Sequence, residues 1–122
     1  MTILVTGGLG YIGSHICSII KNPIILDNKS NSKLNFKKKL PKAKVYLASI
    51  NKNSLRKVFS ENKIKSVIHL AAFKSVEESI SEPLKYYKNN VSILIELLEM
   101  MKEYNIHKFI YSSSATVYGN IN

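Results

Sequence analysis

The amino-acid sequence predicts an α/β fold, a doubly wound parallel sheet of about five strands with helices on both faces. Short apolar runs rich in β-branched residues recur along the chain, and stretches with helical periodicity separate them. Strands that alternate with helices in this way form parallel sheets joined by helical crossovers. The 122 residues suffice for one small domain with its own core, and no linker or internal repeat interrupts them. We therefore expect residues 1–122 to form one domain.

The first three elements form a βαβ unit. Residues 3–5 are a short apolar run that predicts a buried parallel strand, and residues 24–26 predict a second strand after Pro23. Between them a helix begins near Gly10, and its apolar residues recur at helical spacing: Ile12, Ile16, Ile19 and Ile20. The connection before Pro23 is short, so we expect this helix to end early.

The rest of the chain continues the alternation. Residues 28–41 are predicted to form a loop with one helical turn, followed by a strand over 45–48. The next helix is capped by Asn51 or Asn53 and packs through Leu55, Val58 and Phe59. After it we expect a strand over 66–72, a bend over 79–83, a helix over 84–104 and a strand over 108–112. The longest helix has an apolar side formed by Tyr87, Val91, Leu94, Ile95, Leu98 and Met101. No further strand follows the last one, so residues 109–111 should leave an uncovered apolar edge, which is an aggregation hazard.

Three glycines stand in the turn between the first strand and the first helix. Gly7 permits a tight turn out of the strand, Gly10 lets the backbone approach a pyrophosphate, and Gly13 lets the helix pack closely. The free N–H groups and the dipole of the helix N-terminus then favour a phosphate. This pattern indicates a dinucleotide-binding, Rossmann-like unit.

Asp27 strengthens this interpretation, because an acid about twenty residues after the first glycine accepts hydrogen bonds from a ribose 2′-hydroxyl. A carboxylate there disfavours the 2′-phosphate of NADP, so NAD is the predicted cofactor. The spacing is Gly-x-x-Gly-x-x-Gly, and glycine turns also join strands to helices without any ligand. The strand before the turn, the helix after it and Asp27 together favour the cofactor over that alternative.

The formal net charge of +10 raises the question of a nucleic-acid partner. Lysines crowd between residues 33 and 44, where Phe36 is the one aromatic residue, and Arg56 is the single arginine among 18 basic residues. Arginine is the residue preferred for bidentate contacts to phosphates and bases. We expect a solvated basic loop and no nucleic-acid partner, and a polyanion-binding module is a further alternative that rests on this loop alone.

Other features set the remaining expectations. No apolar run has the length of a membrane span, and the N-terminus has no signal-peptide pattern, so we expect no membrane partner and a cytoplasmic location. Cys17 lies among apolar helix residues and is predicted to be buried. No metal-ligand spacing occurs, so no metal site is predicted. His15 and His69 are predicted to pack or to form hydrogen bonds, and His107 to lie at the surface.

Several segments together carry a resemblance to a known family. They are Thr6–His15 (TGGLGYIGSH), Leu26–Asn28 (LDN), His69–Lys74 (HLAAFK), Tyr86–Val91 (YYKNNV) and Ser112–Gly119 (SSSATVYG). With them the chain resembles the extended short-chain dehydrogenase/reductase family, and within it the sugar-nucleotide epimerases, over nearly its whole length.

The resemblance implies NAD as cofactor and places site residues on this sequence. The glycine turn with Tyr11 and Ile12 would hold the pyrophosphate, and Asp27 and Asn28 the adenosine ribose. The other implied cofactor contacts are Asn31, Ser32, Ile50, Leu70, Ala71, Ala72, Lys74 and Asn89. Ser114 is the implied catalytic residue, because it would hydrogen-bond the 4-hydroxyl of the substrate sugar, with Thr116 as a further substrate contact.

The implied activity is the reversible, NAD-dependent interconversion of UDP-glucose and UDP-galactose through a 4-keto sugar. The family performs it with a Tyr-x-x-x-Lys pair that follows the serine run. Here the one such spacing, Tyr104 to Lys108, precedes Ser114 and spans a helix end and a strand start, so we interpret it as chance.

By the same resemblance, we expect the substrate domain to be absent from residues 1–122. We therefore expect the N-terminal portion of such an enzyme, inactive alone, with a C-terminal fragment or a second copy as partner. The alternatives are a non-catalytic NAD-binding remnant or subunit, and another sugar-nucleotide epimerase or dehydratase of the family.

Overall fold

The computed structural model describes residues 2–28, 35–71 and 80–112, apart from the side chains at positions 86 and 89. Five parallel strands form one sheet in the order β3-β2-β1-β4-β5. Their bounds are β1 Thr2–Thr6, β2 Ile24–Asp27, β3 Lys44–Leu47, β4 Ile64–His69 and β5 Lys108–Tyr111. Chain order reverses at β1, which lies between β2 and β4, and ligands of such sheets bind at this reversal, beyond the carboxyl ends of the strands.

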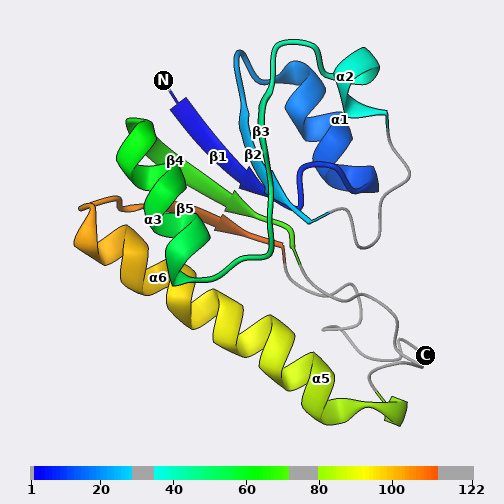
Figure 1. The fold of residues 1–122 in the computed structure, drawn as a ribbon, viewed down its shortest axis with the longest axis vertical. Coiled ribbons are helices and arrows are strands. Elements are labelled where there is room, and N and C mark those ends of the chain that lie inside the picture. Colours follow the sequence, from blue (N-terminus) through cyan, green and yellow to red (C-terminus); the bar gives the residue numbers. More distant parts are fainter. Residues whose placement is uncertain (1, 29–34, 72–79, 113–122) are drawn as a thin grey trace, which may run out of the picture.

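Helices cover both faces of the sheet (Figure 1). On one face lie α1 (Tyr11–Ile19) and the single turn α2 (Phe36–Lys39). On the other lie α3 (Lys52–Glu61) and one long helix made of α5 (Pro83–Tyr87), η1 (Lys88–Ser92) and α6 (Ile93–Glu103). This arrangement confirms the predicted doubly wound, Rossmann-like fold.

Two hydrophobic clusters, one per face, follow from the alternation of side chains along each strand. Leu4 and Leu26 face α3 and α6, where Leu55, Val58, Leu97 and Met100 complete the first cluster. Val5 and Ile25 face α1 and α2, where Cys17 and Leu40 belong to the second. All four central strand residues are fully buried, as expected for a parallel sheet covered on both faces.

Local signals explain where the helices begin and end. The side chain of Asn51 accepts a hydrogen bond from the Ser54 amide, and the Ser54 hydroxyl accepts one from the Asn51 amide, which closes a capping box on α3. Of the two predicted caps, Asn51 is therefore the cap. Helix α1 ends at Ile19, and Asn22 adopts a left-handed φ of 52° before Pro23, which confirms the predicted early end.

The prediction of one long helix is confirmed, but η1 interrupts its α-helical pairing with a π-helical turn that the periodicity did not predict. The side that faces the core also differs from the predicted apolar side. Leu97 and Met100 are buried with Met101, whereas the side chains of Tyr87, Ile95 and Leu98 are exposed. Apolar residues surround most of α6, so its spacing could not select a side, and packing against α3 does.

Strand β4 also differs from its prediction, because it begins at Ile64 and ends at His69 instead of covering 66–72. Strand β4 pairs with β1 from Thr2–Ile64 to Thr6–His69. Because β1 ends at Thr6, β4 has no partner residue on β1 beyond His69. Strand β5 is the last strand of the described sheet, and Ile110 and Tyr111 are 63% and 51% exposed. The predicted apolar edge is present. Across the described ranges, no helix combines the length and apolar character needed to cross a membrane.

Candidate functional site

The ends of β1, β2 and β4 come together at the carboxyl edge of the sheet. Gly7 leaves β1 with a left-handed φ of 70°, which only glycine adopts readily. A Cβ on Gly7 would lie 2.8 Å from the Ala71 amide nitrogen and 2.9 Å from the carbonyl carbon of Leu70. The turn after β1 and the segment after β4 are therefore in direct contact, and only glycine fits between them.

The glycine turn leads directly into α1. The Gly10 amide donates to the Gly7 carbonyl at 3.1 Å, and the Ser14 amide donates to the Gly10 carbonyl at 2.9 Å. No side chain caps α1, whose N-cap is Gly10, and no acidic residue stands in its first turn. The first N–H groups of such a helix have no intrahelical acceptors and suit an anion.

Gly10 and Gly13 have different surroundings. A Cβ on Gly13 would lie 2.2 Å from the Gly7 carbonyl oxygen, so this glycine lets α1 pack against the turn itself. A Cβ on Gly10 would meet only that same oxygen, at 3.4 Å. The backbone of Gly10 (φ −73°, ψ −179°) is also accessible to any residue. Neither packing nor backbone geometry therefore requires glycine at position 10, which leaves space in front of the helix N-terminus.

Asp27 ties the end of β2 to the same turn. Its carboxylate oxygen Oδ2 accepts a hydrogen bond from the Leu9 amide at 3.0 Å. Beside it, the Asn28 amide group donates to the Ser49 hydroxyl at 3.3 Å, which links the ends of β2 and β3. The predicted ribose acid thus lies at the glycine turn, on the side of β1 opposite to Ala71.

Thr6 and His69 form a buried pair on the other side of the turn. The Thr6 hydroxyl oxygen is 2.6 Å from Nδ1 of His69, and both side chains are buried. The same oxygen accepts hydrogen bonds from the amides of Leu70 and Ala71 at 3.2 and 3.4 Å. Burial lowers the pKa of His69 to about 4, so the imidazole is neutral at ordinary pH.

Those predicted cofactor-binding residues that the structure describes are grouped at this edge of the sheet: Gly7, Gly10, Tyr11, Ile12, Gly13, Asp27, Asn28, Ile50, Leu70 and Ala71. Tyr11 and Ile12 are 81% and 47% exposed, whereas Ile50 and Leu70 are buried. Asn31, Ser32, Ala72, Lys74, Ser114 and Thr116 lie outside the described residues, as does the side chain of Asn89, whose backbone belongs to η1.

Sequence reasoning missed two contributors, the Leu9 amide and the Thr6 hydroxyl. A signal for Thr6 existed, because a hydroxyl at the end of a fully buried strand needs a hydrogen-bond partner.

The other residues singled out from the sequence have structural roles. Cys17 is buried, and burial raises its pKa to about 12. Nδ1 of the exposed His15 donates to the Tyr11 carbonyl at 2.7 Å. Helix α6 ends at Glu103 and β5 begins at Lys108, so Tyr104 and Lys108 share no helical face, as predicted. Within the described residues, no three His, Cys, Asp or Glu side chains gather as a metal site requires.

The whole of this site lies in a segment that matches a known family. Residues 3–122 match the NAD dependent epimerase/dehydratase family. The chain belongs to this family. It is 45% identical to the UDP-glucose 4-epimerase of Schizosaccharomyces pombe over 129 residues and 47% identical to that of Neisseria meningitidis serogroup C over 131 residues. These alignments cover 98% and 97% of this chain but 36% and 38% of the two relatives.

Solved structures of the family share the fold. The UDP-glucose 4-epimerase from Stenotrophomonas maltophila with bound NAD and formylated UDP-arabinopyranose superposes with a TM-score of 0.91 at 36% identity, over 100% of this chain and 39% of that chain. The enzyme from Bifidobacterium longum in complex with NAD+ and UDP also gives 0.91, at 38% identity, over 98% of this chain and 38% of that chain. The family resemblance drawn from the sequence is thus confirmed, for a chain that spans less than two fifths of its relatives.

Proposed function

We propose that this chain is the NAD-binding portion of a UDP-glucose 4-epimerase. One observation carries the proposal: the uncapped N-terminus of α1 opens at Gly10, where glycine is required by neither packing nor backbone geometry. An open glycine at a helix N-terminus suits the close approach of a pyrophosphate. The residues present therefore fit the cofactor that the solved relatives hold.

The residues proposed to hold NAD lie on both sides of β1. Gly10, Tyr11 and Ile12 would bind the pyrophosphate through the first turn of α1, and Asp27 with Asn28 would hold the adenosine ribose at the end of β2. Leu70 and Ala71 would line the other half at the end of β4. When bound, NAD supplies the hydride chemistry, and this part of the chain supplies binding and orientation. Ala72, Lys74, Asn89, Ser114 and Thr116 keep their proposed roles from the family resemblance.

The proposed epimerase activity needs more protein than these residues. The printed sequence has no Tyr-x-x-x-Lys pair after Ser114, and the relatives are more than twice as long as the matched segment. We therefore expect this chain alone to bind NAD without interconverting UDP-glucose and UDP-galactose. A spectrophotometric assay that detected turnover by the purified chain at an enzyme-like rate would refute this expectation.

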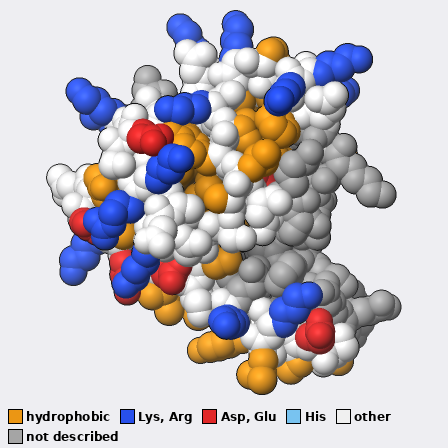
Figure 2. Space-filling model, viewed as in Figure 1, with side chains coloured by type: hydrophobic (Ala, Val, Ile, Leu, Met, Phe, Trp, Pro, Cys, Tyr) orange, Lys and Arg blue, Asp and Glu red, His pale blue; other side chains and the backbone are white. Residues whose placement is uncertain are grey.

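A partner would complete the proposed enzyme, either a C-terminal fragment or a second copy of the chain. Two apolar surfaces support this proposal, the exposed edge of β5 and the exposed side of the long helix, where Leu84 and Tyr87 are 83% and 68% exposed. Figure 2 shows hydrophobic side chains along the margin formed by α5. We also propose a cytoplasmic location, which fractionation of cells that express the chain would test.

A second candidate substrate class comes from one neighbour. The UDP-N-acetylglucosamine 4-epimerase from Methanobrevibacter ruminantium superposes with a TM-score of 0.85 at 36% identity. The NAD-binding portion would serve either sugar nucleotide, so the choice between them belongs to the remainder of the site.

Gly10→Ala tests the proposal most directly, with NAD binding measured by calorimetry. The added methyl group would occupy the space in front of the helix N-terminus, so we expect NAD affinity to fall on the order of tenfold, or about 1.4 kcal/mol. The loss of folding stability should be at most on the order of 1 kcal/mol, the typical cost of placing alanine at a helix N-cap. Ser18→Ala, farther along α1, is the matched control and should leave NAD affinity unchanged. Equal NAD binding by wild type and Gly10→Ala would contradict the proposed pyrophosphate position, and no NAD binding by wild type would contradict the function.

A further inference from the structure

The buried pair of Thr6 and His69 has a fixed direction of hydrogen bonding. A threonine hydroxyl offers one proton and two lone pairs. The Leu70 amide is shared between the Thr6 carbonyl oxygen at 3.0 Å and the Thr6 hydroxyl oxygen at 3.2 Å, and the Ala71 amide donates to the hydroxyl oxygen at 3.4 Å. With both amides directed at its lone pairs, the hydroxyl turns its proton to Nδ1 of His69, 2.6 Å away. This network assigns His69 as the acceptor in the pair, which is the tautomer with its ring proton on Nε2.

This pair joins the ends of three strands. Thr6 is the last residue of β1. Its carbonyl and hydroxyl oxygens share the Leu70 amide, and its hydroxyl oxygen accepts from the Ala71 amide. The ring of His69 stacks with those of Phe109 and Tyr111 on β5, at centroid distances of 6.4 and 5.9 Å. The His69 carbonyl accepts a hydrogen bond from the Ser112 amide at 3.3 Å. The His69 ring therefore packs the end of β4 against β5, whereas the bond to Ser112 is made by the backbone alone.

The contact with Gly7 makes this geometry important for the site. Leu70 and Ala71 lie so close to Gly7 that a single Cβ would not fit. A small rotation of the Thr6 hydroxyl would release the Ala71 amide from its acceptor, and this part of the site would lose its fixed position. The Asp27 side of the turn has its own contact, to the Leu9 amide, and does not depend on His69.

We propose that His69 is a positioning residue of the dinucleotide site, which acts through Thr6. As a buried acceptor it orients the Thr6 hydroxyl, and the hydroxyl holds the Ala71 amide against the glycine turn, next to the Leu70 amide that the Thr6 carbonyl also holds. The proposal rests on the proposed NAD-binding function, and it divides the NAD site into two halves that different residues hold in position. His69 sets the half at the end of β4, and Asp27 sets the half at the end of β2.

Two pairs of variants separate this role from a general structural one. His69→Leu removes the acceptor and keeps an apolar side chain in the core, whereas His69→Asn keeps an acceptor oxygen on a short side chain. Thr6→Val removes the hydroxyl with little change of shape, and Thr6→Ser keeps the hydroxyl. If His69→Leu does not fold, the threonine pair still decides the question.

The binding measurement compares NAD with ADP, which has no second nucleoside. We expect Thr6→Val and His69→Leu to lower NAD affinity on the order of tenfold while ADP affinity stays within about twofold, a difference of about 1.4 kcal/mol between the two ligands. Thr6→Ser should match wild type, and His69→Asn should recover part of the loss. An equal fall for both ligands, or no fall for NAD, would overturn the proposal, because a purely structural role would not separate the two ligands.

Amide hydrogen exchange supplies a readout that needs no ligand. In wild type the Ala71 amide should be protected, and Thr6→Val should accelerate its exchange at least about tenfold while the Val5 amide in β1 is unchanged. If wild type binds neither NAD nor ADP, the proposed function fails, and this exchange experiment still decides whether the pair positions the segment. Unchanged exchange at Ala71 in Thr6→Val would refute the positioning role.

Discussion

Burial acts on two titratable side chains of this protein in opposite directions. It raises the pKa of the Cys17 thiol to about 12 and lowers the pKa of the His69 imidazole to about 4. The cause is the same in both, because a low-dielectric surrounding disfavours whichever form carries the charge. Both groups are therefore neutral near pH 7, and Cys17 serves as a small apolar residue beside Gly8 and Ile25.

The shifted pKa of His69 predicts acid sensitivity. In the unfolded chain this group takes a proton near pH 6.5, and in the folded chain only near pH 4. Between these values the unfolded state binds more protons, so the free energy of unfolding should fall as the pH drops from about 6.5 to about 4. The fall from this group is on the order of 3 kcal/mol.

Urea denaturation between pH 4 and pH 7 would measure this dependence. His69→Asn should remove the part of the slope that belongs to His69, and the exposed His15→Asn should retain the full slope. Identical slopes for wild type and His69→Asn would show that His69 binds its proton equally well in both states.

At the scale of elements, α3 and α6 depend on different kinds of information. Helix α3 carries its own start signal in the Asn51–Ser54 capping box, and its apolar residues Leu55, Val58 and Phe59 face the core. Helix α6 begins with no such signal, because it continues from the π-helical turn η1. It is placed by the contacts it makes with α3, which include an ion pair between Arg56 and Glu103 at 2.8 Å.

Loss of the capping box should therefore weaken α3. We expect Asn51→Ala to lower the free energy of unfolding by about 0.5–2 kcal/mol, because the Ser54 amide loses its acceptor. Asn53→Ala is a matched control, since it changes the same residue type inside the helix on an exposed position, and should stay within about 0.5 kcal/mol of wild type. Equal effects of the two substitutions in thermal denaturation would show that the box does not stabilise the folded chain.

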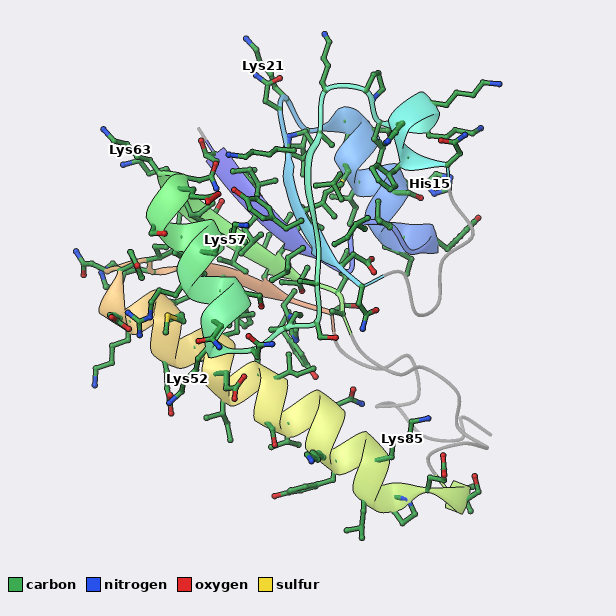
Figure 3. All side chains as sticks on the ribbon, viewed as in Figure 1. His15, Lys21, Lys52, Lys57, Lys63 and Lys85 are labelled. Carbon is green, nitrogen blue, oxygen red and sulfur yellow. The ribbon has the colours of Figure 1, made fainter. Side chains whose placement is uncertain are left out.

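At the scale of the whole molecule, charge and apolar surface are distributed differently. The lysines labelled in Figure 3 lie on α3 (Lys52 and Lys57), on α5 (Lys85) and in the connections before β2 and β4 (Lys21 and Lys63), so much of the positive charge is spread over the surface. The exposed apolar side chains are more concentrated, on the long helix at Leu84, Tyr87 and Ile95 and on β5 at Ile110. Grouped apolar exposure of this kind marks an interaction surface or an aggregation hazard.

These surfaces predict self-association of the isolated chain. We expect sedimentation velocity to detect species larger than the 13.8 kDa monomer. Ile110→Lys should shift the distribution toward monomer, because an edge charge opposes pairing between strands. Ser60→Lys adds the same charge to an exposed polar position of α3 and is expected to have no such effect. A monodisperse wild-type monomer would contradict the prediction and would also weaken the proposal of a partner.

Local patterns in the sequence alone determined the order of strands and helices, the early end of α1, the glycine turn and the acid at the end of β2. Each depends on near neighbours in the chain, such as the spacing of apolar residues or a glycine after a strand. The family resemblance added the cofactor and most of the proposed site residues.

Tertiary structure decided what local patterns could not. The buried side of α6 follows from packing against α3, since apolar residues occur on most of its surface. The π-helical turn has no signature in the periodicity. The contact of Gly7 with Ala71 and the pair of Thr6 with His69 join residues more than sixty positions apart, so only the pairing of β1 with β4 brings them together. The sequence determined which groups are present, and the sheet determined which of them meet, because hydrogen bonds and close packing depend on positions in space.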